Sequence, residues 1–216
     1  MTETQDAEPA LSEPVREALI GLVIRGMHRG ERSPAQAALV ERGLAVVKGP
    51  LLLPSGPAAA IAGAAVRIPP GDPAEARVRR LLEVFLPVNR RLRELCTAWQ
   101  CRPDGSVNDH TDPMYDVGIR DRLDDIHDAI TPILSRLAAD RPSIGGYEAK
   151  LVAAMDNLDA GENGWLASPL LDSYHTVWMH LHQELLMALG MSRKEDEELE
   201  EALVSGSAGL VTGQAG

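Results

Sequence analysis

Aromatic residues and cysteines are scarce in this 216-residue chain, and it has no long apolar run. Aromatic side chains make up 3% of the residues, and all seven lie at or beyond position 85. The two cysteines, Cys96 and Cys101, are too few for a disulfide framework and favour a reducing compartment. No apolar run approaches the ~20 residues that cross a bilayer, and the acidic residues 1–9 do not resemble a secretory signal peptide. We therefore expect a cytoplasmic protein that does not bind membranes.

The common catalytic signatures are also missing. The sequence has no glycine-rich phosphate loop, no G-x-S-x-G nucleophile elbow and no Cys-x-x-Cys metal pair. The sequence therefore assigns no catalytic residue.

Basic side chains are outnumbered by acidic ones, and the net charge is −11. Residues 73–216 hold 14 basic and 24 acidic side chains, a balance of −10, whereas residues 13–72 hold seven and five, a balance of +2. An acidic body does not attract nucleic acid through its general field. Any contact with DNA therefore falls to the N-terminal segment.

Charge and aromatic content both change near the proline- and glycine-rich residues 69–73, which predicts a boundary between two modules there. We expect a disordered N-terminus at residues 1–11, a first module at 12–72, a second at 73–204 and a flexible tail at 205–216. Helix starts are marked by a capping residue followed by proline. These pairs are Ser33-Pro34, Asp72-Pro73, Asp112-Pro113 and Ser168-Pro169.

The spacing of apolar residues predicts the elements of both modules. In the first module it predicts two helices, a β-ribbon and a third helix, at residues 15–30, 34–42, 44–53 and 57–67. In the second it predicts five helices, at residues 75–100, 113–140, 147–160, 169–189 and 193–204. Pro87 and Pro132 are expected to bend the first two of these five helices. Short connections between them favour an antiparallel bundle.

Residues 172–186 hold half of the six histidines, and a helical wheel places His175, Trp178 and His182 on one apolar stripe. A buried imidazole needs partners for its ring nitrogens. These residues are therefore hydrogen-bonded core histidines, the wall of a ligand pocket, or metal ligands. His180 and Glu184 have the i, i+4 spacing of zinc helices, but the same wheel places them on the outward polar face with Gln183 and Ser173.

A second polar constellation lies in the loop at residues 108–112, Asn-Asp-His-Thr-Asp. Its side chains suit a metal ion or an anion, and Asp112 also suits a helix N-cap. A small-molecule ligand would be bound by His175, Trp178, His182, Asn108, His110, Asp112 and Tyr174. A metal, iron or zinc, would be bound by His110, His175, His182 and Asp172.

Two parts of the first module resemble the winged helix of MarR-like regulators. Residues 39–47, Leu-Val-Glu-Arg-Gly-Leu-Ala-Val-Val, are similar to the end of a recognition helix that runs into the wing. Residues 52–56, Leu-Leu-Pro-Ser-Gly, resemble the strand and turn before the next helix. Residues 95–100, 108–112 and 172–178 resemble segments of uncharacterised actinobacterial proteins. Those proteins carry a winged-helix-like segment and are often found with phosphoenolpyruvate-utilising, dikinase-like enzymes.

The resemblance implies a mainly α fold, in which a truncated winged-helix-like N-terminal module precedes a four- to five-helix antiparallel bundle. It also implies a homodimer. DNA would be contacted by Arg29, Arg32, Gln36, Arg42 and Lys48. The module departs from the winged-helix pattern because one helix is missing before the recognition helix, which has only about nine residues, whereas base reading usually takes a full helix. The alternative is that the module serves in dimerisation or docking.

Three functions are compatible with these observations. The first, which we favour, is a ligand-responsive winged-helix-type regulator or accessory binding protein with a small-molecule pocket in its helical domain. The second is a helical iron- or zinc-dependent enzyme that uses His110, His175 and His182. The third, implied by the resemblance alone, is a partner subunit of a phosphoenolpyruvate-utilising phosphotransfer enzyme.

Overall fold

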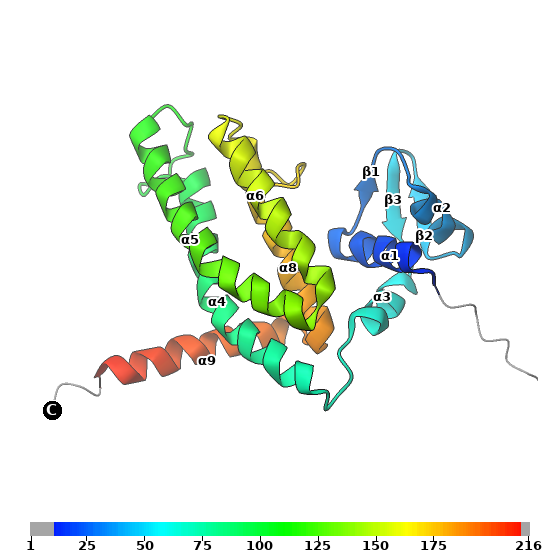
Figure 1. Cartoon of the computed structure of the whole chain (residues 1–216). Helices are drawn as coiled ribbons and strands as arrows, with labels where there is room; N and C mark the ends of the chain where they lie inside the picture. Colours follow the sequence, from blue (N-terminus) through cyan, green and yellow to red (C-terminus); the bar gives the residue numbers. More distant parts are fainter. Residues whose placement is uncertain (1–10, 213–216) are drawn as a thin grey trace, which may run out of the picture. The chain divides into compact units, whose positions relative to one another are not determined.

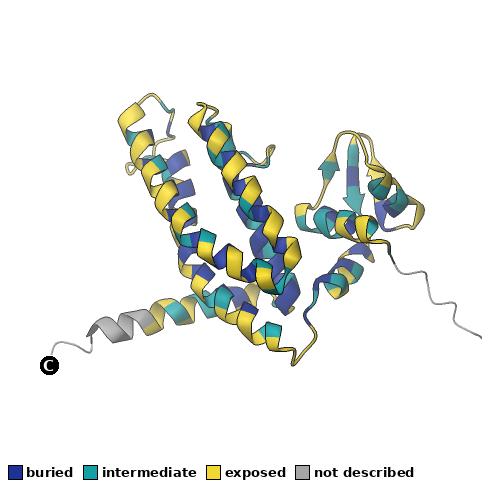
Figure 2. Cartoon of the chain, viewed as in Figure 1, coloured by how far each residue is buried: buried dark blue, intermediate teal, exposed yellow. Residues whose placement is uncertain are grey.

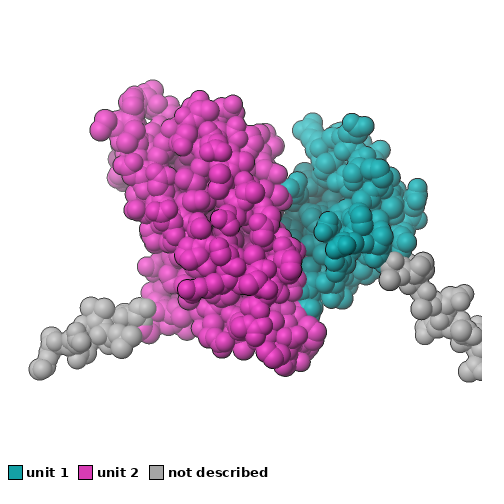
Figure 3. Space-filling view, viewed as in Figure 1, with its two compact units in different colours: residues 1–67 teal, residues 68–216 magenta. Residues whose placement is uncertain are grey.

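The chain divides into two compact units, residues 1–67 and residues 68–216, which Figure 3 shows in different colours. The computed structural model describes the backbone of residues 11–212 and the side chains of residues 11–206. Nearly all of the predicted disordered N-terminus, residues 1–10, lies outside this range. The units divide after Arg67, before the predicted boundary at residue 72. Ile68 belongs to the second unit because its side chain is buried and its N–H donates to the carbonyl oxygen of Ala188 at 2.9 Å.

The first unit combines three helices with a small antiparallel sheet. Its elements in chain order are α1 (Glu13–Arg25), β1 (His28–Arg29), α2 (Pro34–Glu41), β2 (Ala45–Lys48), β3 (Leu51–Pro54) and α3 (Ala58–Val66). The strands lie in the order β1-β3-β2 (Figure 1). The predicted order of helix, helix, β-ribbon and helix is present, and β1 is an addition. Two residues are too short a strand to produce an alternating pattern in the sequence.

The first unit has a core that includes small side chains, and a capping box at the surface begins its second helix. Ala58 and Ala62 of α3 are fully buried, and α3 packs against α1, where Leu19 is also fully buried. At the start of α2 the Ser33 hydroxyl accepts from the N–H of Gln36, and the Gln36 side chain accepts from the N–H of Ser33. This reciprocal capping box fixes where the short α2 begins.

The second unit is helical. Its elements are α4 (Pro73–Gln100), α5 (Pro113–Asp140), the 3-10 turn η1 (Pro142–Ile144), α6 (Gly145–Asp159), α7 (Gly164–Ala167), α8 (Tyr174–Leu189) and α9 (Arg193–Thr212). The long helix α4 contacts α5, α8 and α9, and α6 contacts α5 and α8. Pro87 lies within α4 and Pro132 within α5, and both helices bend in Figure 1. Figure 2 shows that the buried residues face the inside of this bundle.

Three predicted helix boundaries were wrong. The first helix was expected to end at residue 30, but α1 ends at Arg25, where Gly26 adopts a φ of 74° and its N–H donates to the carbonyl oxygen of Leu22. The histidine helix was expected from residue 169, but α8 begins at Tyr174, where the Ser173 hydroxyl accepts from the N–H of Thr176. Residues 169–172 form a turn in which Leu170 is 87% exposed, so helix there would bury nothing. The last helix continues to Thr212 through most of the predicted tail at 205–216. No proline interrupts residues 193–212, and residues 213–216 lie outside the described range.

Candidate ligand-binding groove

The aromatic members of the histidine helix are part of the bundle core. Trp178 is fully buried and stacks on Phe85 of α4 with ring centroids 5.1 Å apart. Its indole Nε1–H donates to Asn89 Oδ1 at 2.9 Å. Tyr174 is also fully buried, and its hydroxyl lies 3.3 Å from His127 Nδ1. These side chains are closely packed, and their polar groups have hydrogen-bond partners. Tyr174 and Trp178 were predicted to line a ligand pocket, but they are part of the core.

His182 is a hydrogen-bonded core histidine. Its side chain packs against the Phe85 ring at 5.1 Å, and its Nε2 lies 3.1 and 3.2 Å from the carboxylate oxygens of Asp196. His182 is 3% exposed and Asp196 is 4% exposed. Because the carboxylate only accepts, Nε2 carries the proton and donates. Nearly all of residues 193–201 are charged, yet this buried pair attaches α9 to α8.

His175 lies on the same stripe but is only partly buried, and no other described residue hydrogen-bonds to it. Burial lowers the pKa of its imidazole below the ordinary value of 6.5. The unfolded chain therefore binds this proton more tightly than the folded protein does. The free energy of unfolding is therefore unaffected by His175 at pH values above the pKa that this ring has in the unfolded chain. It decreases as the pH falls below that pKa.

This difference predicts how stability depends on pH. We expect the free energy of unfolding to fall as the pH is lowered from about 7 to 5, and His175→Gln to reduce that fall. Urea unfolding of both proteins at several pH values measures the two slopes. Equal slopes would show that His175 titrates alike in the folded and unfolded chains.

The predicted metal ligands are dispersed. Within residues 11–206, no group of three or more His, Cys, Asp or Glu side chains is placed to hold a metal ion. His182 is paired with Asp196, and His110 is paired with Asp116. His175 and His182 are seven residues apart on α8, so their Cα atoms are separated by roughly 10 Å along the helix axis. Bending the helix does not bring them together. The set of His110, His175, His182 and Asp172 therefore does not converge on one ion.

The loop between α4 and α5 does form a site. Asn108 is 4% exposed, and its Nδ2 donates to the carbonyl oxygen of Trp99 at 3.1 Å and to Asp116 Oδ1 at 3.0 Å. His110 Nδ1 lies 3.0 Å from the other oxygen, Asp116 Oδ2. The imidazole also packs against the Trp99 ring, with centroids 4.3 Å apart. The ring of His110 is thus held from two sides by buried residues.

These distances fix the tautomer of His110. Its Nδ1 also lies 3.2 Å from Asn108 Nδ2, so two pairings compete for Nδ1. An amide nitrogen has two hydrogens, and Asn108 already uses both on Trp99 and Asp116. Nδ1 therefore carries a hydrogen and donates to Asp116. That leaves Nε2 of His110 as the nitrogen that can accept or donate a proton or bind a ligand.

The backbone at His110 is strained in the way often seen at functional sites. Its φ is 58°, and within the described residues it is the one residue other than glycine with a positive φ. Side chains with a β-carbon rarely adopt this conformation, which costs about 1–3 kcal/mol unless the surroundings enforce it. Here an antiparallel β-bridge between Cys101 and Val107 holds the loop together, and the Asp116 contact holds the ring of His110.

An open groove of about 450 Å³ lies beside this histidine. Its walls come from the end of α4, the loop and α7, which lie together in the second unit (Figure 1). It is lined by Trp99, Gln100, Val107, Asn108, His110, Asn163, Gly164, Ala167 and Ser168. The volume falls in the ~300–1,000 Å³ range of small-molecule sites.

The groove contains two of the seven predicted ligand-binding residues, Asn108 and His110. Asp112 is instead the N-cap of α5, where it accepts from the N–H groups of Met114 and Tyr115, and it is paired with Arg102 at 3.4 Å. These contacts occupy its carboxylate. Asn89 and Trp99 are ten residues apart on α4, roughly 15 Å along its axis, which separates the Trp178 cluster from the groove.

Several residues that hold and complete this groove were not predicted from the sequence. Asp116 looks like one more acidic residue in the first turns of a helix. Trp99 lies near the end of the predicted helix at residues 75–100, outside the polar loop at residues 108–112. Asn163 lies in a glycine-rich connection. The one signal was the distance of six residues from His110 to Asp116, across a helix start marked by Asp112 and Pro113. That arrangement brings a loop histidine back over the first turn of the helix.

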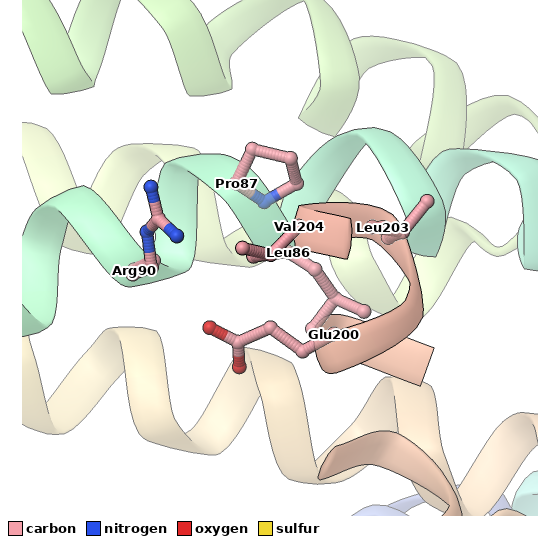
Figure 4. Close-up of a pocket in the computed structure, with 6 residues that line it drawn as sticks. All are labelled: Leu86, Pro87, Arg90, Glu200, Leu203 and Val204. Carbon is pink, nitrogen blue, oxygen red and sulfur yellow. The ribbon is translucent and has the colours of Figure 1, made fainter. Parts of the chain in front are cut away.

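A second, smaller cavity of about 140 Å³ lies between α4 and α9. Figure 4 shows its lining, which is apolar at Leu86, Pro87, Leu203 and Val204 and has Arg90 and Glu200 beside it. Glu200 also forms an ion pair with Arg93 of α4. The cavity lies at the bend that Pro87 causes, where the helix cannot pack closely. Packing at the bend accounts for this cavity.

Comparisons with protein-family models, with curated proteins and with solved structures gave no match. The resemblance to MarR-like winged helices stays a prediction. Within the described residues, no helix has the length and apolar character that crossing a membrane requires.

Proposed function

We propose that this chain is a ligand-responsive regulator or accessory binding protein of the winged-helix type, acting as a homodimer in the cytoplasm. Its helical unit binds a small molecule in the groove beside His110, and its first unit contacts DNA. The observation that carries the proposal is the His110 imidazole, held by Asp116 and Trp99, with Nε2 left over beside the groove. Two free thiols, buried Cys96 and exposed Cys101, are consistent with a reducing compartment.

Several features make this groove suited to a ligand. A preformed cavity with a few fixed polar groups is the usual form of a small-molecule site. The buried Asn108 and Asp116 are both fully engaged, so the His110 ring needs no rearrangement before binding. Preorganisation of this kind lowers the conformational entropy that the protein loses on binding.

We expect ligands found by a thermal-shift screen of small polar metabolites to depend on this histidine. His110→Ala should weaken binding of such a ligand by at least about tenfold, the effect of removing one good polar contact. Asp116→Asn should weaken it as well, because the ring loses the partner that orients it. Gln183→Ala, a polar change on α8 outside the groove, is the matched control. Equal affinity of all four proteins would refute the proposal.

The first unit offers one basic row for phosphates. In the sheet, Arg29 of β1 and Lys48 of β2 are both paired with Leu51 of β3. Directly paired residues of neighbouring strands point to the same face, so Arg29 and Lys48 flank Leu51 on one side of the sheet. Two strand spacings separate them, roughly 10 Å. The exposed Arg32 follows β1 in the next loop.

The other predicted DNA contacts are placed less favourably. The Gln36 side-chain oxygen is occupied by the capping box of α2. Arg42 is the C-cap of α2 and has a partner of its own. Helix α2 has eight residues and a mostly apolar sequence, so direct reading of bases by it is poorly supported. We therefore assign phosphate contacts, rather than base contacts, to the first unit.

This assignment predicts weak, salt-dependent DNA binding. Changing Arg29 and Lys48 together to alanine should lower the slope of log affinity against log salt by about 2, since each phosphate contact contributes ~0.9. The matched control is Arg79→Ala with Arg80→Ala, which removes the same charge from the second unit. Fluorescence anisotropy of a labelled duplex at several salt concentrations measures the slope. No binding at low salt would leave the accessory version, with the first unit in dimerisation or docking.

A further inference from the structure

We infer that the groove beside His110 binds a small oxyanion, a carboxylate or a phosphate. The inference rests on the proposed function, because it assigns a ligand class to the same groove. Nine residues line the groove, and none of them has a carboxylate. The carboxylate of Asp116 lies behind the imidazole, with one oxygen on Asn108 and the other on His110.

Three side chains of the lining can donate a hydrogen bond to a bound anion. Asn163 has its side-chain oxygen engaged by Arg120 Nη2 at 3.2 Å, which leaves the Asn163 amide hydrogens for the groove. The Ser168 hydroxyl oxygen accepts from the N–H of Leu170 at 3.3 Å, so its hydrogen remains to be donated. A protonated His110 ring also donates through Nε2, because its Nδ1–H is already directed at Asp116.

Arg120 supplies fixed positive charge behind this lining. It lies one turn after Asp116 on α5, and its guanidinium orients the Asn163 side chain. The Nε of Arg120 is buried and has no hydrogen-bond partner within the described residues. A buried donor without a partner costs stability, and a nearby anion offsets part of that cost. The donors and the guanidinium thus favour negative charge in the groove.

The dimensions limit the anion to a small molecule. About 450 Å³ of open volume accommodates a compact acid and not an extended polymer. The apolar part of the lining, Val107, Ala167 and Trp99, offers contact for a short carbon skeleton. The expected ligand is therefore a compact acid with a small apolar body, or a phosphate ester of similar size.

The test compares matched anionic and neutral probes on the full chain. Nuclear magnetic resonance titrations use acetate against acetamide, cyclohexanecarboxylate against cyclohexanecarboxamide, and inorganic phosphate alone. We expect the anions to shift the resonances of His110 and Asn163 at millimolar concentrations and the amides to have no effect. Asn163→Asp should weaken anion binding by at least about tenfold because it replaces donors with a negative charge. Asn157→Asp, the same change on α6 outside the groove, is the control.

The outcomes separate this inference from the proposed function. Equal binding of amides and acids in the groove would overturn the anion inference and leave the groove as a binding site. Failure of all anions, together with His110-dependent binding of a neutral metabolite, would do the same. If neither these probes nor the metabolite screen shows binding that His110→Ala removes, both proposals fail. Anion binding that Asn163→Asp leaves unchanged would place the anion elsewhere and overturn the inference.

Discussion

Asp196→Ala should lower the free energy of unfolding of the helical unit by about 3 kcal/mol, because it leaves the buried His182 imidazole without its partner. The His182 Nε2–H donates to the Asp196 carboxylate at 3.1 Å, and both side chains are almost completely buried. An unpaired polar group at such a site loses its hydrogen bond and gains no contact with water. Urea unfolding monitored by tryptophan fluorescence measures the change, since Trp178 packs in the same cluster.

A control on the same helix separates burial from charge. Glu198 is 62% exposed in its side chain and pairs with Lys194 at 3.5 Å on the surface. Glu198→Ala removes the same charge, and we expect it to change stability by less than about 0.5 kcal/mol. Replacing His182 and Asp196 together by leucine should restore much of the loss, because apolar packing substitutes for a buried pair. A loss below about 1 kcal/mol for Asp196→Ala would mean that water reaches His182.

Local signals predicted the order of the elements. Helix starts at Ser33, Asp72 and Asp112 were visible as capping residues followed by proline, and all three caps are present. These signals work because a cap and the first helical turn involve residues within four positions of one another. The same rule failed at Ser168-Pro169, where Ser173 caps the helix instead. Leu170 and Leu171 in this segment are exposed, so an extra turn would gain little burial.

The groove was only partly predictable because its residues are far apart in the sequence. Its polar loop was visible in the sequence, but Trp99 and Asn163 reach His110 and the groove through tertiary structure. Pairs such as His182 with Asp196 join two helices whose packing the sequence pattern does not state. A helical wheel ranks residues by which face they occupy, and it assumes one buried face. Helix α8 violates that assumption because it is packed on several sides by α4, α6 and α7.

Glu184 illustrates the effect of burying α8 on several sides. The wheel placed it on an outward polar face with Ser173, yet Glu184 is 4% exposed and Ser173 is fully buried. One carboxylate oxygen accepts from Ser143 Oγ at 2.6 Å, and the other accepts from the Tyr147 hydroxyl at 2.8 Å. Burial lowers the pKa of the neighbouring Arg141, and the negative charge of Glu184 raises it in part compensation. Glu184 therefore joins α8 to η1 and α6 through the hydroxyl groups of Ser143 and Tyr147, and its charge acts on the Arg141 guanidinium.

Glu184→Ala should lower the free energy of unfolding by about 3 kcal/mol, because it removes two hydrogen bonds and the anion beside a partly buried guanidinium. Glu184→Gln retains the shape and some of the bonding, so its cost should be smaller. Gln183→Ala changes the adjacent position, whose side chain meets Arg193 at the surface, and serves as the control in the same urea experiment. Tyr147→Phe in both backgrounds yields the coupling energy between the two side chains, which we expect to be above about 0.5 kcal/mol. If Glu184→Ala costs no more than Gln183→Ala, the outward placement from the sequence pattern was correct and water reaches this carboxylate.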